Sequence, residues 1–188
     1  MTARLIRLGP SEATAEAERT LAAGGLVVLP TDTVYGVAAD LGRPDAIARL
    51  YFAKERPDEK PIPLLLDGVD GLNGIAGRLG PAAERLIARF TPGGLTLVVP
   101  AQRHLPPELT GGRATVAVRI PDHDWTRCLI AARGGALPTT SANLSGKPPA
   151  LTADEALLAL GDRVDLVIDG GMVPGGVAST VVDVTGDR

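Results

Sequence analysis

The sequence predicts an α/β fold, and two features carry that prediction. Short apolar runs rich in valine, isoleucine and leucine alternate along the chain with segments whose apolar residues recur at helical spacing. Between these runs fall many of the 23 glycines and 16 prolines, as happens where tight turns join short elements. Strands that alternate with helices are typical of an α/β sheet protein.

In the first ninety residues, strands and helices are expected to alternate three times. Ser11 is placed to cap the first helix and Gly24 to end it. Pro44 begins the second helix and Pro57 ends it, because proline fits the first helical turn but cannot continue a helix. The expected strands are 5–8, 26–29 and 61–66, and the expected helices are 11–23, 44 to 55 or 56, and 81–90.

The rest of the chain predicts five more strands and two more helices. Thr152 and Glu155 have the spacing of a capping box for the last helix. The expected strands are 95–99, 115–119, 136–138, 166–168 and 180–184, and the expected helices are 122–133 and 152–160. Because no linker, low-complexity stretch or internal repeat interrupts this order, residues 1–188 are expected to form a single domain.

Composition excludes several classes of protein. Apolar residues make up 45% and charged residues 22%, and the net charge is −3, which argues against a protein that coats nucleic-acid phosphates. Cys128 is the only cysteine, and His104 and His123 are the only histidines, too few for a structural zinc site or a disulfide framework. No apolar signal core opens the chain, and no apolar run approaches the ~20 residues of a membrane span. We therefore expect a cytoplasmic protein with no membrane partner.

Hydroxyl side chains gather after two of the predicted strands. Thr31, Asp32 and Thr33 follow Pro30, and residues 139–141 (Thr, Thr, Ser) follow Pro138. In open α/β sheets, ligands bind outside the carboxyl ends of strands. The alternative interpretation is that these side chains only form local turns with the backbone.

A second concentration of polar chemistry lies at residues 54–61, which read KERPDEKP. Two prolines stiffen this stretch, so that Lys54, Arg56 and Lys60 are able to converge on a triphosphate. The alternative is a solvated loop whose charges compensate one another. The sequence contains no Walker motif and no Gly-x-Gly-x-x-Gly motif between a strand and a helix, so a nucleotide site here would be of another type.

Two further residues have alternative interpretations. Arg119 ends the predicted strand 115–119, where an arginine is either a two-pronged partner for a carboxylate or an exposed residue at a strand end. His123 is interpreted as a helix-start residue and not as a general base.

Six segments in one order resemble the YrdC-like threonylcarbamoyl-AMP synthases. They are PTDTVYGVAAD (30–40), KERPDEKP (54–61), TPGGLTLVVPA (91–101), VAVRIPDH (116–123), TSANLSGKP (140–148) and STVVDVTG (179–186). The resemblance implies a twisted mixed sheet flanked by helices, with a large, locally positive cavity. It implies synthesis of threonylcarbamoyl-AMP and pyrophosphate from L-threonine, bicarbonate and ATP, a nucleotidyl transfer that serves N6-threonylcarbamoyladenosine formation in tRNA.

The resemblance also assigns site residues and partners. Threonine contacts are implied for Thr33, Arg119, Thr139 and Ser179. ATP contacts are implied for Lys54, Arg56, Lys60, Thr115, Ser141 and Asn143. Mg²⁺ is expected to arrive with ATP, with no metal ligand assigned among the side chains and no covalent nucleophile. The tRNA threonylcarbamoyl transferase complex is an expected partner, with weak RNA contact at most.

One departure and two alternatives complete the sequence analysis. The family continues past the last motif to an arginine used near ATP, so its C-terminal end is expected to be shortened here. A first alternative is a non-catalytic YrdC-like protein that binds RNA or assists ribosome assembly. A second is a carbamoyl-adenylate enzyme with a different acceptor.

Overall fold

A computed structural model describes residues 3–9, 11–55, 57, 60–102 and 105–186. The described helices are α1 Ser11–Ala22, α2 Pro44–Ala53, α3 Pro81–Phe90, α4 Pro107–Thr110, α5 Asp124–Ala132 and α6 Ala153–Leu160, with a 3₁₀ segment η1 at Val69–Gly74. The described strands are β1 Arg4–Arg7, β2 Val27–Leu29, β3 Gly36–Ala38, β4 Leu64–Leu66, β5 Leu95–Pro100, β6 Thr115–Arg119, β7 Ala136–Ser141, β8 Leu166–Asp169 and β9 Thr180–Asp183.

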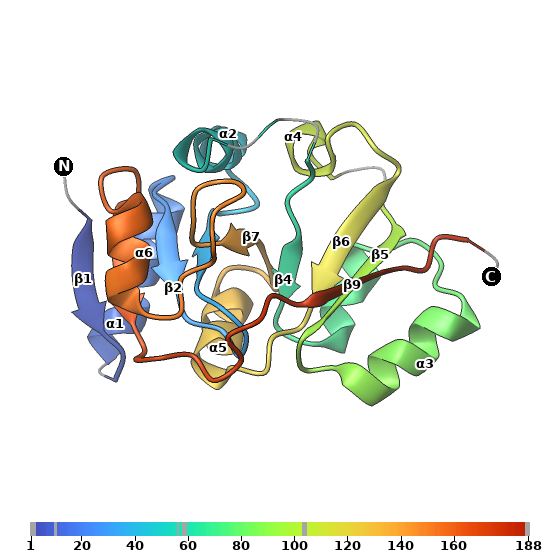
Figure 1. The fold of residues 1–188 in the computed structure, drawn as a ribbon. Coiled ribbons are helices and arrows are strands. Elements are labelled where there is room, and N and C mark those ends of the chain that lie inside the picture. Colours follow the sequence, from blue (N-terminus) through green and yellow to red (C-terminus); the bar gives the residue numbers. More distant parts are fainter. Residues whose placement is uncertain (1–2, 10, 56, 58–59, 103–104, 187–188) are drawn as a thin grey trace.

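The strands of this described part form one mixed sheet in the order β1-β8-β2-β3-β7-β4-β6-β5-β9. Four neighbouring pairs are parallel, namely β1 with β8, β8 with β2, β4 with β6, and β5 with β9. The other four pairs are antiparallel. Helices flank the sheet (Figure 1), which confirms the predicted fold class.

Helices cover both faces of the sheet, and alternate strand residues pack against each layer. In β2, Val28 packs with the helices α2 and α6, whereas Val27 and Leu29 pack with α1 and α5. In β4 the same alternation places Leu65 on the α1 and α5 face and its two neighbours on the other. Burial on both faces explains why these strands are continuous apolar runs in the sequence.

The region after Pro138 differs from the prediction. Residues 139–141 lie inside β7, where they pair with β3, and so do not follow the strand as expected. Proline usually ends a central strand because it has no N–H to donate. Here the carbonyl of Pro138 still accepts from the backbone N–H of Ala39 at 3.0 Å, and Thr139 N–H donates to the carbonyl of Pro63 at 2.9 Å, so the ladder continues past the proline.

The strand β3 was not predicted, and its first residue shows why. Gly36 breaks the apolar pattern, yet a Cβ at this position would lie 2.8 Å from Cγ2 of Thr139. A glycine is therefore required by the close approach of β3 to β7. The short helix α4 and the 3₁₀ segment η1 were also absent from the prediction.

Between β8 and β9 the chain crosses the whole sheet. Residues 170–179, here called the strap, run over the face of the molecule seen in Figure 1, in orange to red. This crossing is needed because β8 lies next to one edge of the sheet and β9 forms the other edge. Among the described helices, none combines the length and the apolar composition that a membrane-spanning helix needs.

Candidate functional site

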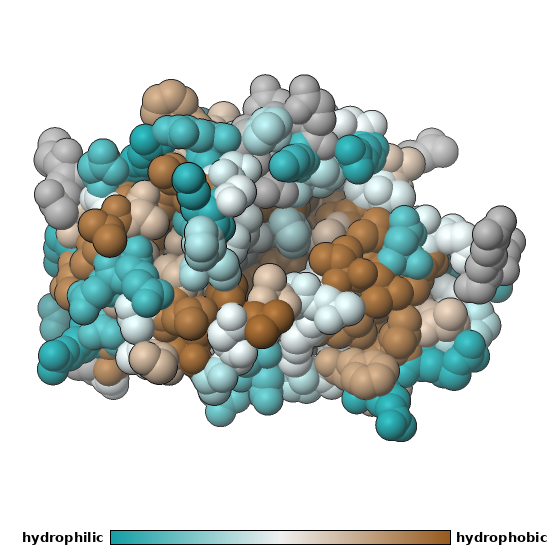
Figure 2. All heavy atoms as spheres, viewed as in Figure 1, coloured by the Kyte–Doolittle hydropathy of each residue, from teal (hydrophilic) through white to brown (hydrophobic). Residues whose placement is uncertain are grey.

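A cavity of about 200 Å³ lies between the middle of the sheet and the strap. The face seen in Figure 2 is hollowed near its centre, above the strap. The polar residues that line the cavity are Thr31, Tyr35, Thr96, Arg119, Thr139, Thr140, Ser141 and Ser179. Among the described lining residues, Arg119 alone carries a charge.

The strap is anchored to the sheet at several points. The Tyr35 hydroxyl donates to the carbonyl of Gly171 at 2.7 Å and accepts from the N–H of Gly170 at 3.0 Å. At the other end, the hydroxyls of Ser179 and Thr96 are 2.7 Å apart. These contacts hold the strap across the cavity and bring Ser179 into its wall.

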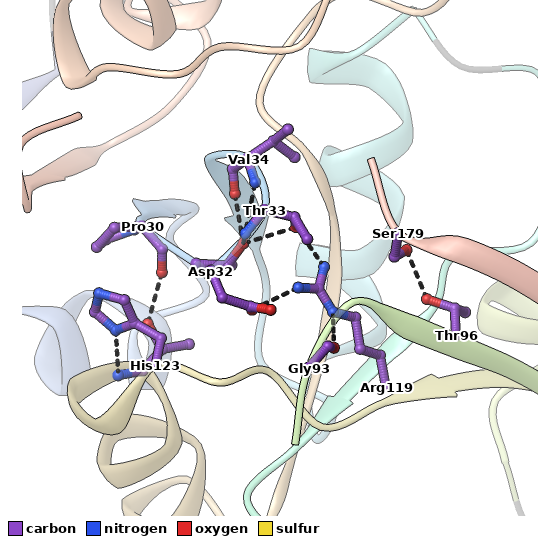
Figure 3. A network of polar contacts seen from close by, with 11 residues as sticks. Pro30, Asp32, Thr33, Val34, Gly93, Thr96, Arg119, His123 and Ser179 are labelled. Atoms are coloured by element: carbon purple, nitrogen blue, oxygen red, sulfur yellow. Dashed lines mark hydrogen bonds and ion pairs between the residues drawn. The ribbon is translucent and has the colours of Figure 1, made fainter. Parts of the chain in front are cut away.

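Arg119 is buried, with only 8% of its surface exposed, so the interpretation of an exposed strand-end arginine is wrong. Its Nε donates to the carbonyl of Gly93 at 3.0 Å, Nη1 to the hydroxyl of Thr33 at 2.7 Å, and Nη2 to Oδ1 of Asp32 at 2.5 Å (Figure 3). The pKa of Arg119 lies below its ordinary value, because burial lowers it more than the neighbouring Asp32 raises it. The guanidinium still stays charged, because the ordinary pKa of arginine is far above neutral pH.

The guanidinium keeps hydrogen-bonding capacity for a ligand. It has five N–H donors, and the three bonds within the described structure use one on each nitrogen. Each terminal nitrogen therefore retains one N–H, which is the number that a two-pronged contact with a carboxylate needs.

The predicted threonine residues are brought together. Arg119, Thr139 and Ser179 line one cavity, and the Thr139 hydroxyl also donates to the carbonyl of Leu137 at 3.0 Å. Thr33 does not line the cavity, but its hydroxyl accepts a hydrogen bond from Arg119, which does. The threonine contacts themselves stay predictions.

Half of the predicted ATP residues also meet, although not as expected. Lys54 is 1% exposed at the C-terminal end of α2, so neither an exposed position nor a solvated charged loop describes it. Its Nζ donates to the carbonyl of Ser141, to the carbonyl of Asn143 at 2.6 Å, and to Oδ1 of Asn143 at 3.4 Å. The ammonium ties α2 to the loop that follows β7.

The other predicted ATP residues are spread out. Lys60 is exposed, and Arg56 lies outside the described residues. Thr115 begins β6 and Arg119 ends it, so at the strand rise they are about 13 Å apart. The ATP contacts of all six residues stay predictions.

His123 is the N-cap of α5, as predicted. Its Nδ1 accepts from the N–H of Thr126 at 3.3 Å, which fixes the neutral form with the proton on Nε2. Burial lowers the pKa of His123 below its usual value of 6.5, against a smaller opposing effect of Asp32.

This lowered pKa predicts how stability changes with pH. Below 6.5 the unfolded chain takes up a proton at His123 that the folded chain does not. The contribution of His123 to the stability of the folded chain is therefore fully present above pH 6.5, and it is lost as the pH falls through the pKa that His123 has in the folded state. The variant His123→Asn keeps a capping oxygen but does not titrate. Urea unfolding at about pH 7.5 and about pH 5 should show a larger loss of unfolding free energy in the wild type than in the variant; equal losses would contradict the linkage.

Sequence reasoning missed three parts of the site. Thr96 lines the cavity. The sequence feature that could have identified it is a single hydroxyl residue within the otherwise apolar strand β5. Asp32 stood in a recognised cluster but received no role. Residues 170–178 of the strap had no signal of chemistry, because most of them are glycine, proline or small and apolar.

The fold and the cavity define an α/β protein with a small pocket in which a buried arginine and several hydroxyl side chains lie beside apolar side chains. The family model described as "Telomere recombination", that of the Sua5, YciO and YrdC proteins, matches residues 19–188. This chain therefore belongs to the Sua5/YciO/YrdC family, which confirms the resemblance.

Individual relatives are similar over most of this chain. A Bacillus subtilis protein named threonylcarbamoyl-AMP synthase is 37% identical over 174 residues, 92% of this chain and 50% of the relative. A Thiobacillus denitrificans protein of the same name is 41% identical over 160 residues, 85% of each chain. The crystal structure of Pyrococcus abyssi Sua5 complexed with L-threonine has a TM-score of 0.89 at 35% identity, and the match covers 97% of this chain and 54% of that one. This chain thus spans about half the length of the Bacillus and Pyrococcus proteins.

Proposed function

We propose that this chain is an enzyme that makes threonylcarbamoyl-AMP from L-threonine, bicarbonate and ATP. The observation that carries the proposal is the buried guanidinium of Arg119, which keeps two N–H groups beside a cavity lined by hydroxyl-bearing and apolar side chains. The names of the Bacillus and Thiobacillus relatives support the activity, and the threonine complex of the Pyrococcus protein supports the amino acid.

The cavity suits a small zwitterion in size and in charge. Its volume of about 200 Å³ is below the ~300–1,000 Å³ of pockets for drug-sized ligands. Asp32 balances the charge of Arg119, so that an amino acid with no net charge adds none to the site. Its carboxylate would take the two N–H groups of Arg119, and its hydroxyl would meet the wall formed by Thr139 and Ser179.

The proposed reaction needs positioning more than it needs a reactive side chain. The ammonium of threonine first releases a proton to solvent; the free amine nitrogen then forms a bond to the carbon of bicarbonate, and water leaves to give an N-carboxylate. An oxygen of this carboxylate then bonds to the α-phosphorus of ATP, while the bond from that phosphorus to the bridging oxygen breaks and pyrophosphate leaves. ATP enters as its magnesium complex, so the protein would contribute alignment and charge neutralisation.

For ATP we propose the side of the site near Ser141, the one predicted ATP residue that also lines the cavity. The loop after β7 is held there by Lys54, and the Asn143 amide donates to the carbonyls of Leu144 at 2.9 Å and Lys147 at 2.5 Å. A loop held in this way is preorganised, so little entropy is lost when a ligand binds.

The proposal predicts pyrophosphate release that requires both bicarbonate and L-threonine. A phosphate assay after pyrophosphatase treatment should show background release when either substrate is left out, because the attacking carboxylate then never forms. Equal release without threonine would indicate a simple ATP hydrolase and contradict the proposal. D-threonine is a matched control, since it carries the same groups in the wrong arrangement.

We further propose that the adenylate is passed in the cytosol to the tRNA threonylcarbamoyl transferase complex. A net charge of −3 supports only weak direct contact with RNA, which should fall further as salt is raised.

A further inference from the structure

Asp32 contacts Arg119 on the side of the guanidinium that faces away from the cavity. The two side chains are 15% and 7% exposed, and their Oδ1 and Nη2 atoms are 2.5 Å apart. Arg119 lines the cavity and Asp32 does not. Figure 3 shows Asp32 on one side of the guanidinium, with Ser179 and Thr96 toward the other. The direct contact of Asp32 with the cavity wall is therefore its ion pair with Arg119.

The turn that carries Asp32 is fixed by its own hydrogen bonds. The Thr31 hydroxyl donates to the carbonyl of Val34 at 2.7 Å and accepts from the N–H of Thr33 at 3.1 Å. Because the Thr31 proton is used in this way, the 3.1 Å contact between the Thr31 and Thr33 hydroxyls has Thr33 as its donor. The Thr33 oxygen then accepts from Arg119, so one turn supplies two of the three partners of the guanidinium.

The strap packs directly against this turn at Gly175. A Cβ on Gly175 would lie 2.5 Å from the carbonyl oxygen of Asp32 and 2.8 Å from Cα of Thr33. The next residue, Gly176, donates its N–H to the carbonyl of Thr33 at 3.0 Å. Since Gly175 does not have a positive φ, close packing and not backbone conformation requires a glycine there.

We propose that Asp32 is a positioning residue, which orients the guanidinium of Arg119 toward the carboxylate of the bound amino acid. The fixed turn and the strap hold the Asp32 carboxylate in one place. Because this carboxylate is ion-paired with Arg119, it also fixes the position of the guanidinium. The identity of the ligand rests on the proposed function, whereas the orientation of Arg119 by Asp32 does not.

A double-mutant cycle tests whether Asp32 acts through Arg119. Affinity for L-threonine would be measured by NMR titration, which follows millimolar dissociation constants, in Asp32→Ala, in Arg119→Ala and in the double variant. Asp32→Ala should weaken threonine binding by about 10-fold or more when Arg119 is present, and should have little further effect when Arg119 is absent. Equal losses in both backgrounds, or no loss in either, would overturn the proposal. The matched control is Asp70→Ala, which removes an exposed carboxylate.

A second measurement needs no threonine. The Nε–H and Nη–H signals of Arg119, assigned by their disappearance in Arg119→Lys, should be sharp and slow to exchange with water in the wild type. They should broaden in Asp32→Ala, and unchanged signals would overturn the proposal. If the wild type binds no L-threonine, the proposed function fails, and this measurement still decides the role of Asp32.

A glycine variant keeps the test informative if Asp32→Ala does not fold. Gly175→Ala moves the turn without removing a polar group, and should both broaden the Arg119 signals and weaken threonine binding. Gly74→Ala is its matched control, because a Cβ at Gly74 meets nothing within 4 Å. Identical behaviour of the two glycine variants would contradict the role of the strap.

Discussion

The variant Arg119→Lys is expected to weaken L-threonine binding by about 10- to 150-fold and to leave ATP affinity unchanged. This range corresponds to the loss of a charge-assisted hydrogen bond, worth about 1.5–3 kcal/mol. Lysine keeps the charge, but it cannot contact Gly93, Thr33 and Asp32 and still offer two parallel N–H groups to a carboxylate.

Calorimetric titration of threonine, with a non-hydrolysable ATP analogue present, measures this effect without turnover. Arg85→Lys is the matched control, because Arg85 is an exposed residue of α3 and such changes cost less than ~0.5 kcal/mol. Equal threonine affinities in the wild type and Arg119→Lys would remove Arg119 from the site. Thr139 and Ser179 would then lack a charged partner for the substrate carboxylate.

The second large effect is expected on stability, from Lys54→Met. Methionine keeps the apolar stem of the side chain but leaves the carbonyls of Ser141 and Asn143 without the Lys54 donor. The Ser141 carbonyl still accepts from the N–H of Asn143 at 3.0 Å, so the Asn143 carbonyl is the acceptor that is left unsatisfied, at a cost of about 1–3 kcal/mol of unfolding free energy. For a chain of this size that corresponds to a melting temperature lower by about 2–12 °C.

Thermal melting with Lys147→Met as control tests this expectation, because Lys147 is exposed in the same loop. Unchanged melting of Lys54→Met together with weakened ATP binding would show that Lys54 acts on phosphate directly and not through the loop. The sequence alone had favoured that outcome, because prolines and charges at 54–61 are typical of an exposed loop. Burial of Lys54 by contacts 87 and 89 residues away has no local signature.

What the sequence predicted well depends on local physics. The proline at Pro44 and the capping oxygen of Thr152 place the starts of α2 and α6, because a helix start is decided within one turn. The apolar runs place β2 and β4, since both faces of these strands are buried. The expected capping box is changed at one point, as the Glu155 carboxylate accepts from the N–H of Leu151 and not from that of Thr152.

What the sequence could not predict depends on contacts between distant segments. The pairing of β3 with β7 joins residues about a hundred positions apart, and it carries 139–141 into the sheet. The ion pair of Asp32 with Arg119 spans 87 positions. The strap is recognisable only when β8 and β9 are seen near opposite edges of one sheet. The motifs identified most of the side chains at the cavity, whereas the arrangement that holds them required the structure.

The central claim is that this chain joins the carbon of bicarbonate to threonine and activates the product with AMP. The most direct test incubates the protein with ATP, Mg²⁺, L-threonine and ¹³C-labelled bicarbonate, and follows the nucleotide products by mass spectrometry. We predict an adenylate with the mass of threonylcarbamoyl-AMP that becomes heavier by one mass unit with the labelled bicarbonate. An adenylate that carries no label, or one that forms equally well without threonine, would contradict the account.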